Sequence, residues 1–158
     1  MGGARRDVHQ RALGLLAVRQ RSRRELERRL LQAGFEPVEV DAELDRLEGV
    51  GLVDDEVFAR AVVESRGTRR GEAPRLVAQR LRQAGVEPGT IAQVLDDAAL
   101  DEQAGADALA RARLSRLTSL EPAAAFQRLT GYIARRGYAP EVARAAARRA
   151  LAWQVEPD

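Results

Sequence analysis

Apolar side chains recur along this chain every three to four residues, which is the spacing that places them on one face of an α-helix. Residues 26–33 and 77–84 show the pattern most clearly, and the second stretch repeats the apolar positions of the first. No stretch alternates apolar and polar residues as a half-buried strand does, and no Asn-Gly hairpin signal occurs. The pattern therefore predicts an all-α protein.

Glycine and proline punctuate this helical pattern in the same way three times. Each glycine follows an amphipathic run, an apolar residue comes next, and a proline follows two residues further on. A left-handed glycine commonly ends a helix, and proline fits the first turn of the next one. Each segment is therefore predicted to be a helix, a tight turn and a second helix. The pairs are Gly34 with Pro37, Gly85 with Pro88, and Gly137 with Pro140.

A further helix is predicted before each of these pairs, near residues 8–20, 54–66 and 101–117. Residues 67–71 (GTRRG) are predicted to form a turn within the second unit. The result is nine helices in three tandem three-helix repeats. Each repeat buries too little surface for us to expect it to fold alone. We therefore expect the repeats to form an elongated stack. The predicted boundaries are residues 8–50, 51–100 and 101–153.

Two local features of the first repeat lead to specific expectations. In its first helix we expect Leu13, Leu16 and Ala17 to lie on the buried face. Ser22 is followed three residues later by Glu25, which is the pattern of a capping box at the start of the next helix.

The composition indicates a folded chain with separate basic and acidic regions. The chain has 158 residues, no cysteine and 45% hydrophobic residues, so it has no disulfide and no thiolate chemistry. All 26 basic residues are arginine, which keeps the pI near 9.8 at a formal net charge of +2. Along the chain the charge alternates in blocks of +6, −8, +5, −5 and +4. This is unlike the uniform basic stripe of a dedicated DNA-binding domain.

The sequence offers little material for catalysis. The single histidine, His9, is expected to be a solvated surface residue. The acids Asp54, Asp55 and Glu56 fit an N-cap and first helical turn better than a metal site. No phosphate-binding glycine loop or membrane-length apolar run occurs. We therefore expect a non-enzymatic, cytoplasmic monomer with no catalytic residue, no metal, no cofactor and no membrane contact.

Arginine clusters occupy corresponding parts of the three predicted repeats. For a single arginine a solvated face is the better interpretation, but recurrence favours a binding role. Guanidinium groups suit acidic protein surfaces and phosphate backbones. The few aromatic residues argue against base stacking. The candidate binding residues are Arg21, Arg23, Arg24, Arg28, Arg69, Arg70, Arg75, Arg135, Arg136, Arg144 and Arg148.

Three segments in this order resemble the RecX regulatory proteins: RSRRELERRLLQAGF (21–35), L-x-x-L-x-x-x-GLVDDEVFA (44–59) and RRGEAPRLVAQRLRQAGV (69–86). The resemblance extends from about Ala12 to Trp153. It implies tandem three-helix repeats in a curved, elongated molecule that binds along the groove of the RecA–DNA filament. It also implies modulation, usually inhibition, of RecA's ATP hydrolysis, strand exchange and repressor cleavage. That would place the chain in recombination, DNA repair and the SOS response.

Two other functions fit the same residues. A sequence-nonspecific DNA-binding repeat protein would also use helix–glycine turn–helix pairs and arginines, and could bind single- or double-stranded DNA weakly. The near-neutral net charge argues against it. A helical-repeat scaffold for an unrelated protein would have the same composition. Under the filament hypothesis, reversing Arg23, Arg24 and Arg28 to Glu is expected to weaken binding without unfolding the protein.

Overall fold

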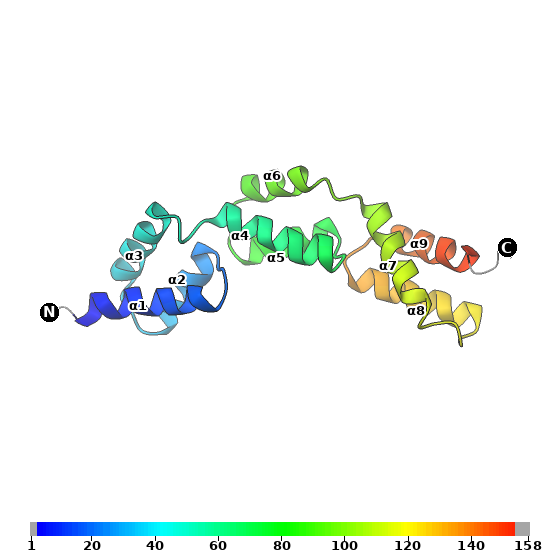
Figure 1. The fold of residues 1–158 in the computed structure, drawn as a ribbon, viewed down its shortest axis with the longest axis horizontal. Helices are drawn as coiled ribbons and strands as arrows, with labels where there is room; N and C mark the ends of the chain where they lie inside the picture. The colour runs from blue at the N-terminus through cyan, green and yellow to red at the C-terminus, as the bar shows by residue number, and fades with distance from the viewer. Residues whose placement is uncertain (1–2, 154–158) are drawn as a thin grey trace. The chain divides into compact units, whose positions relative to one another are not determined.

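The computed structural model describes the backbone of residues 3–153 and the side chains of residues 7–152. Within that range the chain forms nine α-helices and one π-helical segment, and no strand is present, so the all-α prediction is confirmed (Figure 1). The elements are α1 (Gly3–Val18), α2 (Arg23–Gln32), α3 (Pro37–Gly49), α4 (Asp55–Val62), η1 (Val63–Arg69), α5 (Pro74–Gln83), α6 (Pro88–Ala98), α7 (Glu102–Leu114), α8 (Pro122–Arg135) and α9 (Pro140–Trp153).

The glycine and proline punctuation works as the sequence predicts. Helices α3, α6 and α9 begin at the three prolines. The three turn glycines have positive φ angles between +80° and +95°. In the first two turns the residue after the glycine donates its N–H back to the last helical turn, Phe35 to the Leu30 carbonyl (3.3 Å) and Val86 to the Leu81 carbonyl (3.0 Å). These bonds complete Schellman motifs, which satisfy carbonyl groups that a helix end leaves open.

The predicted helix caps are also confirmed. The Ser22 hydroxyl accepts the Glu25 N–H (3.1 Å), and the Asp54 carboxylate accepts the Val57 N–H (3.2 Å). The Glu25 side chain does not close the capping box; its carboxylate pairs with Arg19 at 3.1 Å. Of the two capping-box side chains, only Ser22 therefore caps α2.

The predicted buried face of α1 is wrong at Leu13 and Ala17. Leu13 is 37% exposed and Ala17 is exposed, while Val8 and Ala12 are fully buried. Leu16 is half-buried beside the core. The true stripe is rotated around the helix because α2 and α3 pack against the side that carries Val8 and Ala12. Apolar residues surround much of α1, so periodicity alone did not identify which side the other helices cover.

The predicted turn at residues 67–71 starts later than expected. The chain continues as the π-helical segment η1 to Arg69, and only Gly71 takes a positive φ (+70°). Gly67 lies buried inside this segment, where a Cβ atom would come within 2.9 Å of Leu100. In a sequence, a glycine such as Gly67 suggests the end of a helix, but here it allows Leu100 to pack closely against the helical segment.

The chain divides into two compact units. The first comprises Met1–Ala61 with Arg80–Val94, and the second comprises Val62–Gln79 with Leu95–Asp158. The core of the first unit is built mainly from leucine and valine of α2 and α3, including Leu26, Leu30 and Leu44. The three-repeat boundaries drawn from the sequence stay a prediction.

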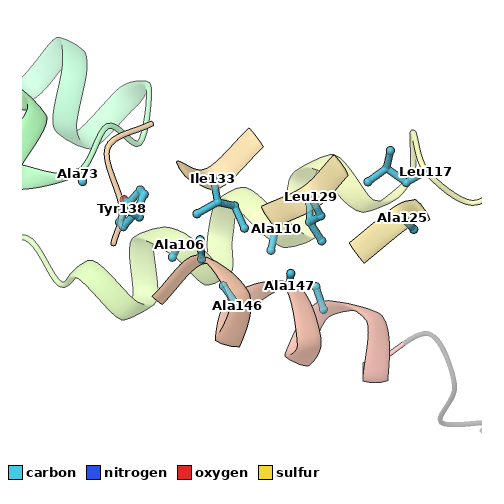
Figure 2. Packing of buried hydrophobic residues seen from close by; sticks show 12 residues of the cluster. Ala73, Ala106, Ala110, Leu117, Ala125, Leu129, Ile133, Tyr138, Ala146 and Ala147 are labelled. Atoms are coloured by element: carbon cyan, nitrogen blue, oxygen red, sulfur yellow. The ribbon is translucent and has the colours of Figure 1, made fainter. Parts of the chain in front are cut away.

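The second unit has a core rich in alanine. Figure 2 shows alanine side chains of α7 and α9 gathered with larger side chains of α8. Ala106 and Ala146 are completely buried, as are Leu129 and Ile133. Small side chains allow helices to approach closely, and alanine favours the helix at no cost in side-chain entropy. The alanine-rich segment that was predicted as the third repeat therefore forms a closely packed core.

The same contact occurs once in each unit. In the first unit the Ser22 hydroxyl, at the start of α2, donates to the Ala84 carbonyl (2.6 Å) in the turn after α5. In the second unit the Ala73 N–H, at the start of α5, donates to the Arg136 carbonyl (2.8 Å) in the turn after α8. Residues 22 and 73 occupy equivalent positions of the sequence repeat, as do residues 84 and 136. The start of α2 therefore contacts the glycine turn after α5, and the start of α5 contacts the glycine turn after α8.

Candidate partner-binding surfaces

Arg21 lies inside the fold rather than on a surface. Its side chain is 6% exposed, and its Nε donates to the Leu15 carbonyl (3.1 Å). Burial and the charges of Arg19 and Arg29 lower its pKa. Its Nη1 is buried and makes no hydrogen bond to the described residues. The geometry assigns Arg21 to the α1–α2 connection and gives a partner no access to it.

Arg23 is held by three carboxylates of α3. Its guanidinium pairs with Asp41 (2.7 Å), Asp45 (2.8 Å) and Glu48 (2.8 Å), and its N–H donates to Asp55 (2.9 Å). Burial alone would lower the pKa of Arg23, but the Asp45 and Glu48 carboxylates outweigh it and the pKa is raised. This network ties α2 to α3 and uses the donors that a partner would need.

Arg24 and Arg28 are exposed on α2. Arg24 borders a hollow of ≈ 360 Å³ together with Arg23 and lies across Gly85. Four carboxylates line the same hollow, those of Glu27, Glu48, Asp55 and Glu87. The hollow therefore carries more negative than positive groups, which suits a mixed-charge protein surface better than a phosphate backbone.

The second arginine cluster is spread out. Arg69 is exposed and pairs with Glu64 at 3.4 Å. Arg70 and Arg75 are exposed, on the turn before α5 and on α5 itself. The carbonyl of Arg70 accepts a hydrogen bond from the Arg136 guanidinium (2.6 Å), so these two candidates do meet.

Two arginines of the third cluster lie against aromatic rings of α8. The Arg136 guanidinium lies 5.2 Å from the centre of the Tyr132 ring, and that of Arg148 lies 5.8 Å from the Phe126 ring. Such cation–π contacts fix the arginine side chains on the surface. Arg135 and Arg144 are exposed on α8 and α9.

A basic groove beside α7 and α8 was missed by the sequence interpretation. We call this hollow of ≈ 500 Å³ the α7–α8 groove. Of its four arginines only Arg135 was a candidate. The spacing gave a usable signal, because Arg128 and Arg135 lie two helical turns apart on one face. Its lining comprises Arg113, Arg116, Leu117, Gln127, Arg128, Gly131, Tyr132 and Arg135.

His9 is not the solvated residue expected from the sequence. Its Nδ1 is hydrogen-bonded to the carboxylate of Glu43, which is buried on α3. The pair is 34 residues apart in sequence and joins α1 to α3. A buried carboxylate needs such a partner, which explains the contact.

The acids that could have suggested a metal site have other roles. Asp54 caps α4, Asp55 accepts the Arg23 N–H, and Glu56 pairs with Arg60 at 2.9 Å. Among the described residues no group of three or more histidine or carboxylate side chains is placed to hold a metal ion. No helix of residues 3–153 is both long and apolar enough to cross a membrane.

Comparison with known families and proteins identifies relatives that match most of the chain. Residues 9–47 match the model of the family described as RecX, first three-helix domain, and residues 54–95 match RecX, second three-helix domain. A protein named regulatory protein RecX from Halorhodospira halophila is 39% identical over 92% of this chain and 89% of its own length. Another of that name from Mycobacterium avium is 40% identical over 83% of this chain and 77% of its own length.

Two solved structures share the fold. A crystal structure of RecX from Lactobacillus salivarius has a TM-score of 0.74 at 14% identity, over 95% of this chain and 98% of that one. A crystal structure titled regulatory protein RecX has a TM-score of 0.69 at 20% identity, over 88% of this chain and 69% of that one. At these identities the likeness concerns the fold alone.

Proposed function

The chain belongs to the RecX family of regulatory proteins, and we propose that it binds the RecA–DNA filament and inhibits RecA's ATP hydrolysis, strand exchange and coprotease activity. The observation that carries this proposal is 39–40% identity to proteins named regulatory protein RecX over most of the chain. In this proposal the chain acts in the cytoplasm as a monomer and performs no chemistry of its own. DNA outside the filament is at most a weak partner.

The arrangement of the second helices supports binding to a repeating partner. A filament presents the same surface at every protomer. This chain presents equivalent helix starts and glycine turns more than once, joined by the Ser22–Ala84 and Ala73–Arg136 hydrogen bonds. A chain with repeated units can make the same kind of contact at successive protomers.

The exposed arginines supply the polar contacts in this proposal. Arg24, Arg28, Arg75 and Arg144 are exposed, whereas Arg21 and Arg23 are engaged inside the first unit. A planar guanidinium can bind a carboxylate through two parallel hydrogen bonds. We therefore narrow the filament-binding surface of the first unit to Arg24 and Arg28.

The decisive experiment measures RecA ATP hydrolysis on single-stranded DNA as this protein is added. We expect inhibition at ratios well below one protein per RecA protomer, because blocking one position affects neighbouring protomers of the filament. Binding to the same DNA without RecA is measured in parallel. Unchanged ATP hydrolysis together with tight, salt-sensitive binding to DNA alone would favour the rival DNA-binding function.

A charge-reversal pair locates the surface in the first unit. The Arg24→Glu, Arg28→Glu variant is expected to raise the concentration needed for half-inhibition about tenfold, because charge reversal replaces attraction with repulsion. The matched control is Arg11→Glu, Arg46→Glu, which makes the same change in net charge at two exposed residues outside the proposed surface. Circular dichroism checks that both variants stay helical. Equal inhibition by the two variants would exclude this surface.

A further inference from the structure

The connection between α3 and α4 exposes a group of apolar side chains. Val50, Leu52 and Val57 are 66%, 52% and 48% exposed, and we call these three residues the α3–α4 apolar patch. Every large apolar side chain that is exposed among residues 7–152 belongs to the first unit, and three of those seven lie in this short stretch. Apolar side chains that are exposed together mark interaction surfaces, whereas single ones do not.

The α3–α4 apolar patch adjoins the hollow of ≈ 360 Å³ beside Arg24. Glu48 at the end of α3 lines that hollow and comes two residues before Val50. Asp55 at the start of α4 lines it too and comes two residues before Val57. The patch and the hollow therefore form one surface, and all of its residues belong to the first unit.

The hollow carries negative charge that the described residues do not neutralise. Arg23 is already paired with three carboxylates of α3. Glu27 and Glu87 are exposed, and neither forms an ion pair with a cation of residues 7–152. Within the described lining Arg24 is the only other cation, so carboxylates are in excess. Carboxylates that face one hollow repel one another, and a bound cation relieves that repulsion.

We propose that this surface binds a basic amphipathic helix of a partner protein. In this proposal an arginine or lysine side chain of the partner enters the hollow, and apolar side chains of the partner cover the α3–α4 apolar patch. Apolar contact supplies most of the affinity, while the complementary charges set the orientation. A helix suits both contacts, because side chains three and four residues apart project from the same face.

Other ligands match the surface less well. A bare metal ion needs several ligands around one point, and no group of three or more histidine or carboxylate side chains in the described chain is placed to hold one. Nucleic acid would bring phosphates toward carboxylates and be repelled. A guanidinium or ammonium group at the end of a long side chain presents several N–H donors, which can reach carboxylates that stand apart.

This surface goes beyond the proposed RecA modulation and does not depend on it. That proposal uses the cations Arg24 and Arg28, whereas this one uses the carboxylates and the apolar patch. The Arg24→Glu, Arg28→Glu variant is therefore expected to move the two activities in opposite directions. It should weaken inhibition of RecA and tighten binding of a basic helix, because it adds negative charge beside the hollow.

The first test measures fluorescence anisotropy of a labelled leucine–arginine peptide, about 18 residues long so that it can form a helix, mixed with the full chain. The Glu27→Gln, Glu87→Gln variant is expected to weaken binding about tenfold, because it removes charges that face the bound cation. The matched control, Asp96→Asn with Glu141→Gln, makes the same change in net charge at two exposed carboxylates of the second unit. It should stay within about twofold of the wild type.

The second test concerns the apolar contact and uses the same peptide. The Leu52→Ser, Val57→Ser variant is expected to weaken binding about fivefold or more, because apolar surface is lost from the contact. Its control is Val18→Ser with Val38→Ser, which removes two exposed apolar side chains outside the patch. Circular dichroism and thermal unfolding verify that every variant stays folded.

Four outcomes would overturn the proposal. The wild-type chain could fail to bind the leucine–arginine peptide, or could bind a leucine–glutamate peptide of the same length equally well. Either surface variant could weaken binding no more than its control, or Arg24→Glu with Arg28→Glu could weaken it. An absence of RecA inhibition by the wild type would contradict the proposed function alone, because the peptide measurement contains no RecA.

Discussion

At the scale of single residues, the glycine turns offer a test of what an inter-repeat contact contributes. Gly34 and Gly85 have similar positive φ angles, +95° and +80°. A Cβ atom at Gly34 would meet no heavy atom of the described residues within 4 Å, whereas one at Gly85 would lie 2.6 Å from the Cβ of Arg24. The two positions share backbone strain and differ in packing.

Replacing each glycine by alanine should therefore destabilise the protein unequally. Gly34→Ala is expected to cost about 1 kcal/mol, the penalty for a left-handed alanine. Gly85→Ala should cost about 2–4 kcal/mol, because the α2 start must also move away from the turn. Urea denaturation followed by circular dichroism measures both. Similar losses would mean that Arg24 adapts freely and that the contact is loose.

Tyr138 should make the second unit sensitive to high pH. The Tyr138 hydroxyl donates to the Gly71 carbonyl (3.0 Å), and burial together with the charge of Glu102 raises its pKa above 10.0. A raised pKa means that folding favours the protonated phenol. Its contribution is therefore fully present below about pH 10, the unfolded value, and is lost as the pH rises through the folded value.

The experiment compares thermal unfolding of the wild type and Tyr138→Phe between pH 8 and pH 11. At pH 8 the variant should be less stable by about 1 kcal/mol, since one buried hydrogen bond is lost. As the pH rises above about 10, the difference should shrink, because only the wild type loses the contribution of a neutral phenol. A difference that grows with pH would contradict the assigned direction of the pKa shift.

Residue-scale predictions from the sequence succeeded where the cause is local. Ser22 and the turn glycines are specified by residues within one helical turn, and each lies as expected. His9 failed because its partner Glu43 is 34 residues away. A single sequence contains no direct signal for a pair of that separation.

At the scale of helices, the alanine-rich packing of α7 and α9 leads to a further prediction. Ala146 on α9 is completely buried, while Ala108 on α7 is exposed. Ala146→Leu should destabilise the protein by about 1–3 kcal/mol, because a larger side chain must separate closely packed helices. Ala108→Leu, the control, should change stability by less than about 0.5 kcal/mol. Thermal unfolding distinguishes them, and a neutral Ala146→Leu would reveal an unfilled core.

Helix starts at the prolines were predicted correctly, whereas the buried face of α1 and the helix end near residue 67 were not. The starts of α3, α6 and α9 follow from proline chemistry, which is local. The buried side of α1 depends on where α2 and α3 pack, and the π-helical segment η1 depends on close packing of Gly67 against Leu100. Both are tertiary effects that override the local pattern.

At the scale of the whole molecule, charge counting indicated arginines as candidate binding residues but not where the fold places them. In the sequence Arg21 and Arg23 belong to a basic cluster. In the structure Arg21 donates to the Leu15 carbonyl and Arg23 pairs with carboxylates of α3. The arginines of the α7–α8 groove are scattered along the sequence, and the fold brings them together. Arg116 and Arg128 are separated by a connection whose path the sequence does not reveal. Surface arginines become a site only when the fold brings them together without acids.

Ser22 both caps α2 and links its start to the turn after α5. Replacing it tests whether that link stabilises the chain more than a helix cap alone. The Ser22 hydroxyl accepts the Glu25 N–H and donates to Ala84, whereas Asp101 accepts the Ala104 N–H (3.0 Å) as the cap of α7. Asp101→Ala should therefore cost about 1 kcal/mol, and Ser22→Ala about 2–3 kcal/mol. Hydrogen exchange should accelerate at residues 84–86 only in Ser22→Ala. Because the Ala84 carbonyl is then left without its donor, equal losses in the two variants would show that the capping bond alone matters and that the link between helices adds no stability.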